Sequence, residues 1–198
     1  MNPSCTPFCS YLSDRWRTSL FRADIFPGFP FVPLNWQALA FNRDNAGDMR
    51  LPSNIWRCLL DQAHERTRDT RAFVVSPAPI IGGVVMEREQ PFVVPLDERS
   101  VLAHFSDMSL YLPEFFMSTA SERWAIWGDS DLTVLGAECE LITAVIEEYG
   151  GEAKAIEEMA RDFGLRNTTE DHSMWTYLKG LVAQPESRQL GAIKGGGG

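Results

Sequence analysis

The order of hydrophobic and polar residues predicts helices towards both ends of the chain and strands in its middle. Apolar side chains form one stripe over residues 10–22, made by Trp16, Leu20 and Phe21. Ser53 is a favourable N-cap residue for a second helix, over residues 53–70. Three further helices are expected over residues 138–149, 152–163 and 173–181. Glycines follow the first two of these as left-handed caps, at Gly150 and Gly164.

A segment rich in proline and aromatic residues, 25–35, separates the first two of these helices along the chain. Proline interrupts helices and central strands alike, so this segment belongs to neither. We expect an extended arm that packs on the surface of the core, in preference to a loop that binds a ligand.

The middle of the chain has the residue pattern of short strands separated by turns. Residues 72–95 hold runs of β-branched residues separated by proline and glycine, which predicts two or three strands, with a bulge or bend at Gly82 and Gly83. Asp97 is placed to cap a helix over 98–110. Further strands are expected over 115–118, 124–127 and 132–135, with a hairpin turn at 119–123.

Strands gathered in the middle of a chain and flanked by helices indicate an α+β fold with a mostly antiparallel central sheet. A length of 198 residues suits a single domain over 1–194, in which 1–35 form the N-terminal helix and the proline-rich arm. A glycine tail follows at 195–198. Regular βαβ alternation and a glycine fingerprint after a strand are both missing, which argues against a Rossmann or P-loop fold.

The chain starts without the basic and apolar pattern of a signal peptide, and its apolar runs are too short to cross a membrane. We therefore expect a cytoplasmic protein. Its four cysteines are expected to be reduced thiols, because no second pair of Cys or His completes a zinc site.

Charge is distributed unevenly along the chain. Residues 1–71 carry nine basic and seven acidic side chains, a balance of +2, whereas residues 72–198 carry nine basic and twenty acidic ones, a balance of −11. Within 138–162, eight acids accompany only Lys154 and Arg161. A negative surface of this kind repels nucleic acids and acidic membranes and attracts basic proteins.

Sequence motifs for catalysis are missing. The three histidines lie far apart in the sequence, and the H-E-x-x-H pattern fails because Arg68 follows His64 and Glu65. The chain has no G-x-S-x-G nucleophile motif, and IIGGVV lacks the Lys and Ser/Thr of a phosphate loop. We predict no catalytic residue, no metal site and no cofactor.

Two acidic features remain to be interpreted. Asp129 and Asp131 can hold a divalent ion or can stabilise a tight turn through local backbone amides, and the turn is the preferred interpretation. The glutamates of 138–162 form either a solvated face or an interface with a partner. The absence of partners one helical turn away favours the interface for four of them, Glu147, Glu148, Glu157 and Glu158.

Residues 121–138, SERWAIWGDSDLTVLGAE, resemble a pattern of bacterial immunity proteins from polymorphic-toxin and contact-dependent systems. In that pattern a strand reading roughly W-x-I-x-G-D leads through an acidic turn to a second apolar strand and then a helix. The matching residues are Trp124, Ile126, Gly128, Asp129, Leu132 and Val134. The resemblance covers about a tenth of the chain and implies a cytosolic, non-catalytic binder that covers the active site of a toxin. It does not identify any residue of this chain as one that binds a partner.

We therefore predict a cytoplasmic inhibitor of a basic protein partner, with no nucleic-acid or membrane partner. The first alternative is a small metal-dependent hydrolase that uses Asp129 and Asp131, with His104 or Glu114 as a further candidate beside the sheet. The second is an adaptor protein of a secretion or phage-related system. The predicted partner-binding residues, chosen for their surface chemistry, are Trp127, Asp129, Asp131, Glu147, Glu148, Glu157 and Glu158.

Overall fold

The fold was obtained as a computed structural model of the chain. It describes residues 16, 19–22, 28–33, 35–46, 50–86, 91–107, 109–165 and 173–183. The strands are β1 (Trp36–Asn42), β2 (Arg71–Val75), β3 (Ile80–Ile81), β4 (Val84–Val85), β5 (Phe92–Pro95), β6 (Leu110–Tyr111), β7 (Phe115–Thr119), β8 (Trp124–Gly128) and β9 (Leu132–Glu138). The helices are α2 (Arg43–Ala46), α3 (Ser53–Thr67), α4 (Glu98–Ser106), α5 (Cys139–Glu148), α6 (Glu152–Asp162) and α7 (Ser173–Val182).

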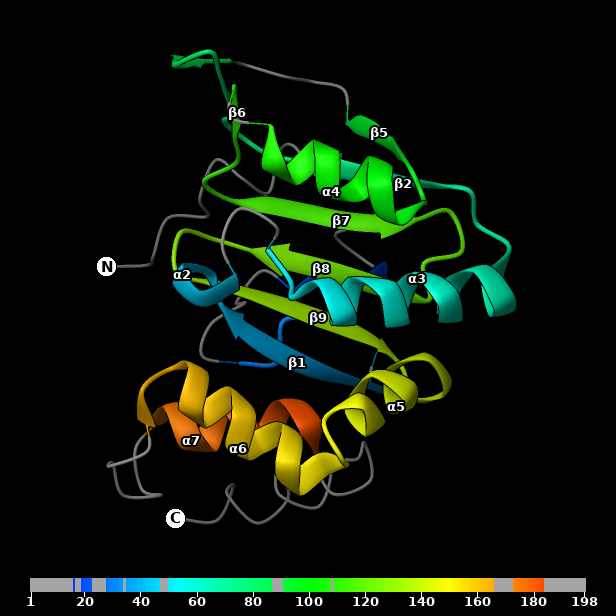
Figure 1. The fold of residues 1–198 in the computed structure, drawn as a ribbon, viewed down its shortest axis with the longest axis vertical. Coiled ribbons are helices and arrows are strands. Elements are labelled where there is room, and N and C mark those ends of the chain that lie inside the picture. The colour runs from blue at the N-terminus through cyan, green and yellow to red at the C-terminus, as the bar shows by residue number, and fades with distance from the viewer. Residues whose placement is uncertain are drawn as a thin grey trace.

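Six strands form the main sheet, in the order β1-β9-β8-β7-β2-β5, and every neighbouring pair is antiparallel (Figure 1). A second, three-stranded sheet has the order β4-β3-β6. The predicted α+β fold with a mostly antiparallel sheet is confirmed. Strands β7, β8 and β9 follow one another as a meander, so the predicted turn at 119–123 joins β7 to β8.

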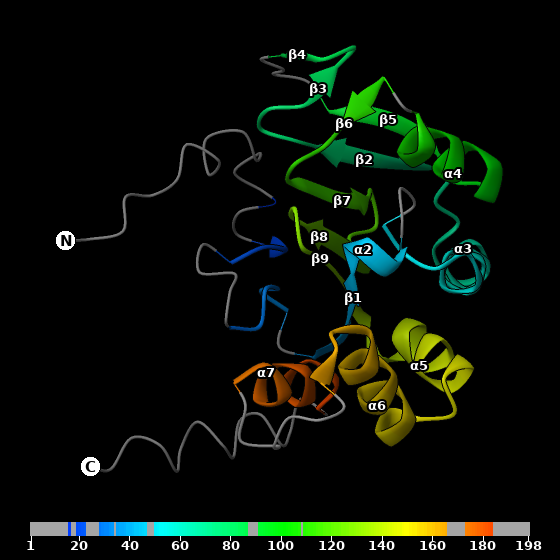
Figure 2. The ribbon, with the colours of Figure 1, turned by 60° about the vertical axis from the view of Figure 1, so that its left-hand side comes forward.

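The main sheet is covered on both faces, which explains why β7 and β8 are buried along their whole length. Helices α3, α4 and α5 lie on one face, and the segment that includes residues 19–22 and 28–33 lies on the other (Figure 2). Trp16, Leu20 and Phe21 are buried, as their stripe predicts. Phe31 in the proline-rich segment is fully buried and pairs with Phe21 in a β-bridge, so this part of the arm belongs to the core rather than to its surface.

Strand β1 is the main element that the sequence pattern did not predict. It pairs with β9 over seven residues and buries six of its seven residues. Because both of its faces are covered, β1 has no alternation of polar and apolar residues from which a strand could be recognised. Its outer edge is closed by side chains of α6: Ala40 N donates to Met159 Sδ (3.1 Å), and Asn42 N donates to Asp162 Oδ2 (2.8 Å).

Local signals in the sequence placed several helix ends correctly. Asp97 caps α4, because its Oδ1 accepts a hydrogen bond from Ser100 N (2.9 Å). Gly150 and Gly164 have φ of +90° and +70°, the left-handed conformation expected after α5 and α6. The cap predicted at Ser53 is wrong, since the N-cap of α3 is Pro52 and no side chain caps it.

Two boundaries differ from the sequence prediction in an informative way. Helix α4 ends at Ser106 rather than at residue 110, because Leu110 and Tyr111 pair with β3 as strand β6. Gly82 and Gly83 both have positive φ and form the two-residue turn of the β3–β4 hairpin, which replaces the expected bulge or bend. Residues 10–15, 23–27 and 195–198 of the predicted N-terminal helix, arm and tail lie outside the described residues.

Candidate functional site: the α5–α6 region

The seven predicted partner-binding residues lie in two parts of the fold. Trp127, Asp129 and Asp131 lie at the turn between β8 and β9. The four glutamates lie on α5 and α6, which follow β9 along the chain. The structure therefore gives the two groups different surroundings.

Trp127 is only 4% exposed, so its ring is part of the core and is not displayed to a partner. The ring Nε1–H donates to Glu114 Oε1 (3.1 Å). Burial raises the pKa of Glu114; the hydrogen bond from Trp127 opposes that rise, and the negative charge of Asp129 adds to it. The sequence analysis named Glu114 only within the hydrolase alternative and did not predict its burial or its contact with Trp127.

Asp129 has the turn role that the sequence favoured over metal binding. Its Oδ1 accepts hydrogen bonds from Asp131 N (2.8 Å) and Leu132 N (2.9 Å), and its own N–H donates to Leu132 O. The buried Arg43 guanidinium donates to the carbonyl oxygens of Asp129 and Pro113. Within the described ranges, no three His, Cys, Asp or Glu side chains gather in a way that could hold a metal ion.

Glu147 and Glu148 form the last turn of α5 and are both exposed. Of the eight acids in 138–162, these two have no side-chain hydrogen bond or ion pair with any described residue. The charge of Glu148 reaches α3, where it adds to the effect of burial in raising the pKa of Cys58. On the same helix the pKa of Arg57 is raised by its hydrogen bond to Glu98 and also by the charge of Glu148. Glu147 and Glu148 are therefore the acids of the segment without a direct side-chain pairing among the described residues.

Glu157 and Glu158 are paired, so the expectation that they lack partners one turn away is wrong. Lys154 Nζ lies 3.1 Å from Glu157 Oε2 and 3.5 Å from Glu158 Oε1, and Arg161 also pairs with Glu158. Spacings of three and four residues place these groups side by side on α6. Such exposed pairs stabilise a helix by only about 0.3–0.5 kcal/mol each, but they neutralise much of the local charge.

The other four acids of the segment also have ion-pair or hydrogen-bond partners. Glu138 pairs with Arg123 (2.7 Å), and Glu140 pairs with Arg123 (3.3 Å) and Arg66 (3.7 Å). The remaining two acids accept hydrogen bonds from β1: Gln37 Nε2 donates to Glu152 Oε1 (3.0 Å), and Asp162 accepts from Asn42 N. Fewer acids of the segment are therefore without a side-chain partner than the sequence analysis expected.

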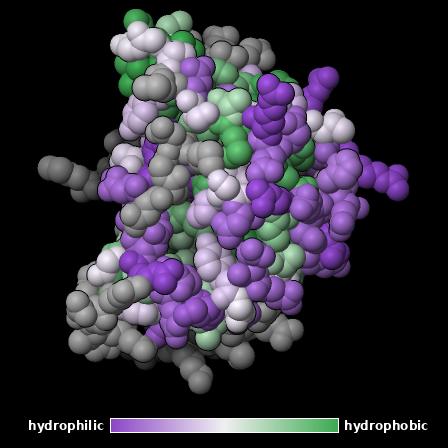
Figure 3. Space-filling model, in the orientation of Figure 1, coloured by the Kyte–Doolittle hydropathy of each residue, from purple (hydrophilic) through white to green (hydrophobic). Residues whose placement is uncertain are grey.

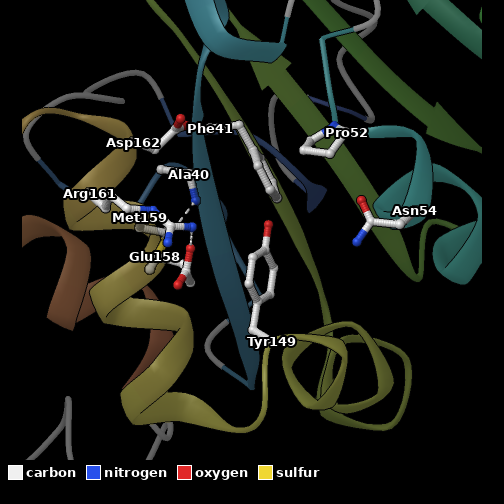
Figure 4. A pocket seen from close by; sticks show the side chains of 9 residues that line it. All are labelled: Ala40, Phe41, Pro52, Asn54, Tyr149, Glu158, Met159, Arg161 and Asp162. Atoms are coloured by element: carbon white, nitrogen blue, oxygen red, sulfur yellow. Dashed lines mark hydrogen bonds and ion pairs between the residues drawn. The ribbon is translucent and has the colours of Figure 1, made fainter.

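A cleft of about 210 Å³ lies beside this surface, between the start of α3, β1 and α6 (Figure 4). Tyr149, which directly follows Glu148, forms one wall, and its hydroxyl points towards Phe41. Burial and the charge of Asp162 raise the pKa of Tyr149, so its phenol remains a neutral donor in the physiological range. The lining residues are Ala40, Phe41, Pro52, Asn54, Tyr149, Glu158, Met159, Arg161 and Asp162.

The cleft combines an apolar floor with a polar rim. Carboxylates and a guanidinium come from α6, an amide comes from Asn54 at the start of α3, and a phenol comes from the α5–α6 turn. The cleft could not be predicted from the sequence, because β1 contributes Ala40 and Phe41 to its lining and that strand was not predicted. Of the predicted site residues, Glu158 is the one that lines this cleft.

Comparisons with protein-family models, with curated proteins and with solved structures found no significant match to this chain. The resemblance of residues 121–138 to immunity proteins therefore stays a prediction from the sequence. None of the helices in the described ranges is both long enough and apolar enough to cross a membrane.

Proposed function

We propose that this chain is a non-catalytic binding protein that inhibits a basic protein partner, as immunity proteins neutralise toxins. The observation that carries the proposal is the pair of exposed carboxylates at the end of α5, Glu147 and Glu148, which immediately precede a polar cleft wall at Tyr149. As an inhibitor of this kind, the protein acts in the cytoplasm, and its negative surface disfavours nucleic acids as partners.

Electrostatics gives this surface a role in association. Two unpaired carboxylates on neighbouring residues repel each other, and the net charge of −9 adds a long-range negative field. A basic partner relieves that repulsion and is attracted before contact, which raises the association rate more than it raises the final affinity.

The cleft supplies a place for an anchoring side chain. A lysine or arginine of the partner has an apolar stem that matches the floor of Phe41 and Met159. Its cationic end would meet the carboxylate of Asp162 and the phenol of Tyr149 at the rim. Long basic side chains of this kind are frequent anchors in protein interfaces when they enter a pocket.

The test is a binding and protection experiment with the toxin encoded next to this chain's gene. We expect a complex at low salt and protection of cells that express the toxin. The double variant Glu147→Gln/Glu148→Gln should associate roughly tenfold more slowly, because steering is weakened. Glu65→Gln, at an exposed glutamate of α3, is the matched control and should associate like the wild type.

No complex at low salt would contradict the proposal. Unchanged association of the double variant would also contradict it, because the carboxylates would then have no role in recognition. A stable complex that leaves the toxin active would identify an adaptor protein instead of an inhibitor.

A further inference from the structure

The β3–β4 hairpin has an exposed, uncharged apolar surface. This surface lies outside both the core and the cleft lined by β1 and α6. Val84 and Val85 are 60% and 64% exposed, and Ile81 and Met86 are 36% and 43% exposed. Tyr111 on the neighbouring strand β6 is also exposed, but its ring packs against the guanidinium groups of Arg43 and Arg50 and is not part of this surface. Figure 3 shows hydrophobic side chains gathered at the corner of the molecule where this hairpin lies. Exposed apolar side chains gathered in one place commonly mark an interaction surface.

The backbone of β4 is an open strand edge. In the hairpin, Ile81 pairs with Val84 and Ile80 pairs with Val85, and Met86 N donates to Pro79 O (2.9 Å). Because antiparallel strands alternate hydrogen-bonded and non-hydrogen-bonded pairs, the N–H and C=O of Val85 point away from β3. Among the described residues nothing covers this edge, whereas α6 closes the edge of β1.

We propose that β4 pairs antiparallel with β4 of a second copy of this chain. Residues 72–86 contain no charged side chain, so the hairpin has no group that would select a charged partner. An antiparallel strand can pair with itself about a two-fold axis. With the axis at Val85, the Val85 N–H of each copy donates to the Val85 C=O of the other, which satisfies both open groups.

The size of the surface indicates how tight this dimer is. The four apolar side chains of the hairpin leave on the order of 400 Å² exposed per copy, so a symmetric contact buries at most on the order of 800 Å² in total. Stable interfaces bury roughly 1,200–2,000 Å². The proposed dimer is therefore weak.

This inference is independent of the proposed function. The hairpin and the α5–α6 region lie at opposite ends of the long axis of the molecule (Figures 1 and 2). Pairing through β4 therefore leaves Glu147, Glu148 and the cleft open in both copies. Loss of dimerisation does not affect the binding test above, and loss of toxin binding does not affect dimerisation.

Sedimentation of the full chain between about 1 µM and about 200 µM tests the proposal, since a contact smaller than a stable interface is expected to associate only towards the upper end of this range. The wild type should shift from monomer to dimer across it. Val85→Lys places a charge on the open edge, and Val85→Pro removes the outward N–H without removing a hydrogen bond of the hairpin. Both variants should stay monomeric, with unchanged far-ultraviolet circular dichroism.

Val93→Lys is the matched control. Val93 is 52% exposed on β5, the outer strand of the main sheet, and its substitution should leave the dimer intact. A second measurement uses Val85→Cys: opposite residues of a hydrogen-bonded pair have Cα atoms about 5.5 Å apart, which suits a disulfide. A dimer band on a non-reducing gel is expected for Val85→Cys and not for Val93→Cys.

The proposal is overturned if the wild type remains monomeric over the whole concentration range. It is also overturned if Val93→Lys dissolves the dimer and Val85→Lys does not, because β5 would then be the contact. Growth beyond a dimer would overturn the two-fold arrangement.

Discussion

At the scale of single residues, side-chain positions decide between interpretations that the sequence leaves open. Asp129 is the clearest case, since the D-x-D pattern is compatible with a metal ligand as well as with the turn that the sequence analysis preferred. Its Oδ1 accepts two backbone N–H groups, which is the arrangement of an Asx turn. Trp127 shows the opposite outcome, because an aromatic residue chosen as a surface anchor belongs to the core.

Substitution of Asp129 tests its role in the turn. Asp129→Ala should lower the free energy of unfolding by about 1–2 kcal/mol, because two backbone amides lose their acceptor. Asp129→Asn keeps an acceptor oxygen and should stay close to the wild type. Urea unfolding followed by tryptophan fluorescence measures both variants. A stoichiometric metal in the purified wild type that is lost from Asp129→Ala would instead favour the hydrolase alternative.

Glu114 should give the protein a measurable pH dependence. Burial raises the pKa of this carboxyl in the folded state, so the folded protein holds the proton more tightly than the unfolded chain. Stability from this group is therefore highest below the ordinary pKa of glutamate. It falls as the pH rises from that value through the raised folded pKa.

The variant Glu114→Gln isolates this contribution, since it cannot ionise and its amide oxygen can still accept from Trp127 Nε1. The free energy of unfolding of the variant minus that of the wild type should increase from about pH 4 to about pH 8. Chemical denaturation at several pH values measures that difference. A difference that is independent of pH would contradict a raised pKa.

At the scale of elements, close packing between the main sheet and the N-terminal segment depends on a row of small residues. Gly136 on β9 lies between Ala38 on β1 and Ala125 on β8. A Cβ built on Gly136 would lie 2.3 Å from Phe31 Cε2, which is far closer than packed atoms approach. Phe31 can therefore lie flat against the sheet only because position 136 has no side chain.

We expect Gly136→Ala to lower the free energy of unfolding by about 1–3 kcal/mol through overpacking. Gly180→Ala is the matched control, because a Cβ at this position in α7 meets nothing within 4 Å. That control should be neutral or stabilising by up to about 1 kcal/mol. Thermal and urea unfolding measure both, and the smaller Phe31→Leu should partly restore the Gly136→Ala variant. Equal effects of the two alanine substitutions would contradict the packing argument.

Amphipathic helices were predictable from their one exposed face, and doubly covered strands were predictable only where they are marked by aromatic or β-branched residues, as β7 and β8 are. The amphipathic pattern of α5 and α6 and their following glycines placed both helices within a residue or two. Strand β1 buries both faces, so its sequence, WQALAFN, is apolar without a period. The cleft was missed for the same reason, because β1 forms its floor.

At the scale of the whole molecule, ion pairs between distant segments neutralise part of the charge that the sequence concentrates in one segment. Segment 138–162 has a net charge of −6 in sequence, yet arginines from α3 and from the β7–β8 turn, Arg66 and Arg123, neutralise its start. Among the described acids of this segment, those at the end of α5 keep no direct ion pair. Within segment 138–162, we therefore expect recognition by charge to depend mainly on Glu147 and Glu148.

The association rate with a basic partner should therefore fall steeply with ionic strength. Between about 0.01 M and about 0.15 M salt the screening length drops from roughly 30 Å to roughly 8 Å, so steering by Glu147 and Glu148 is lost. Stopped-flow mixing with the basic partner of the proposed function measures this slope. The Glu147→Gln/Glu148→Gln variant should have a shallower slope than Glu65→Gln. Identical slopes would place the recognition charge elsewhere.

The sequence by itself determined the fold class, the cap of α4 and the ends of α5 and α6, because these depend on neighbours along the chain: Asp97 with Ser100, Gly150 after α5, and Gly164 after α6. Tertiary structure alone decided which charges remain free, which aromatic residues are buried, and where a cleft and an open strand edge lie. These features depend on residues that are distant in sequence, such as Arg66 with Glu140 and Phe31 with Gly136. The local sequence pattern cannot predict such pairs, since the two residues come into contact only when the chain is folded and packed.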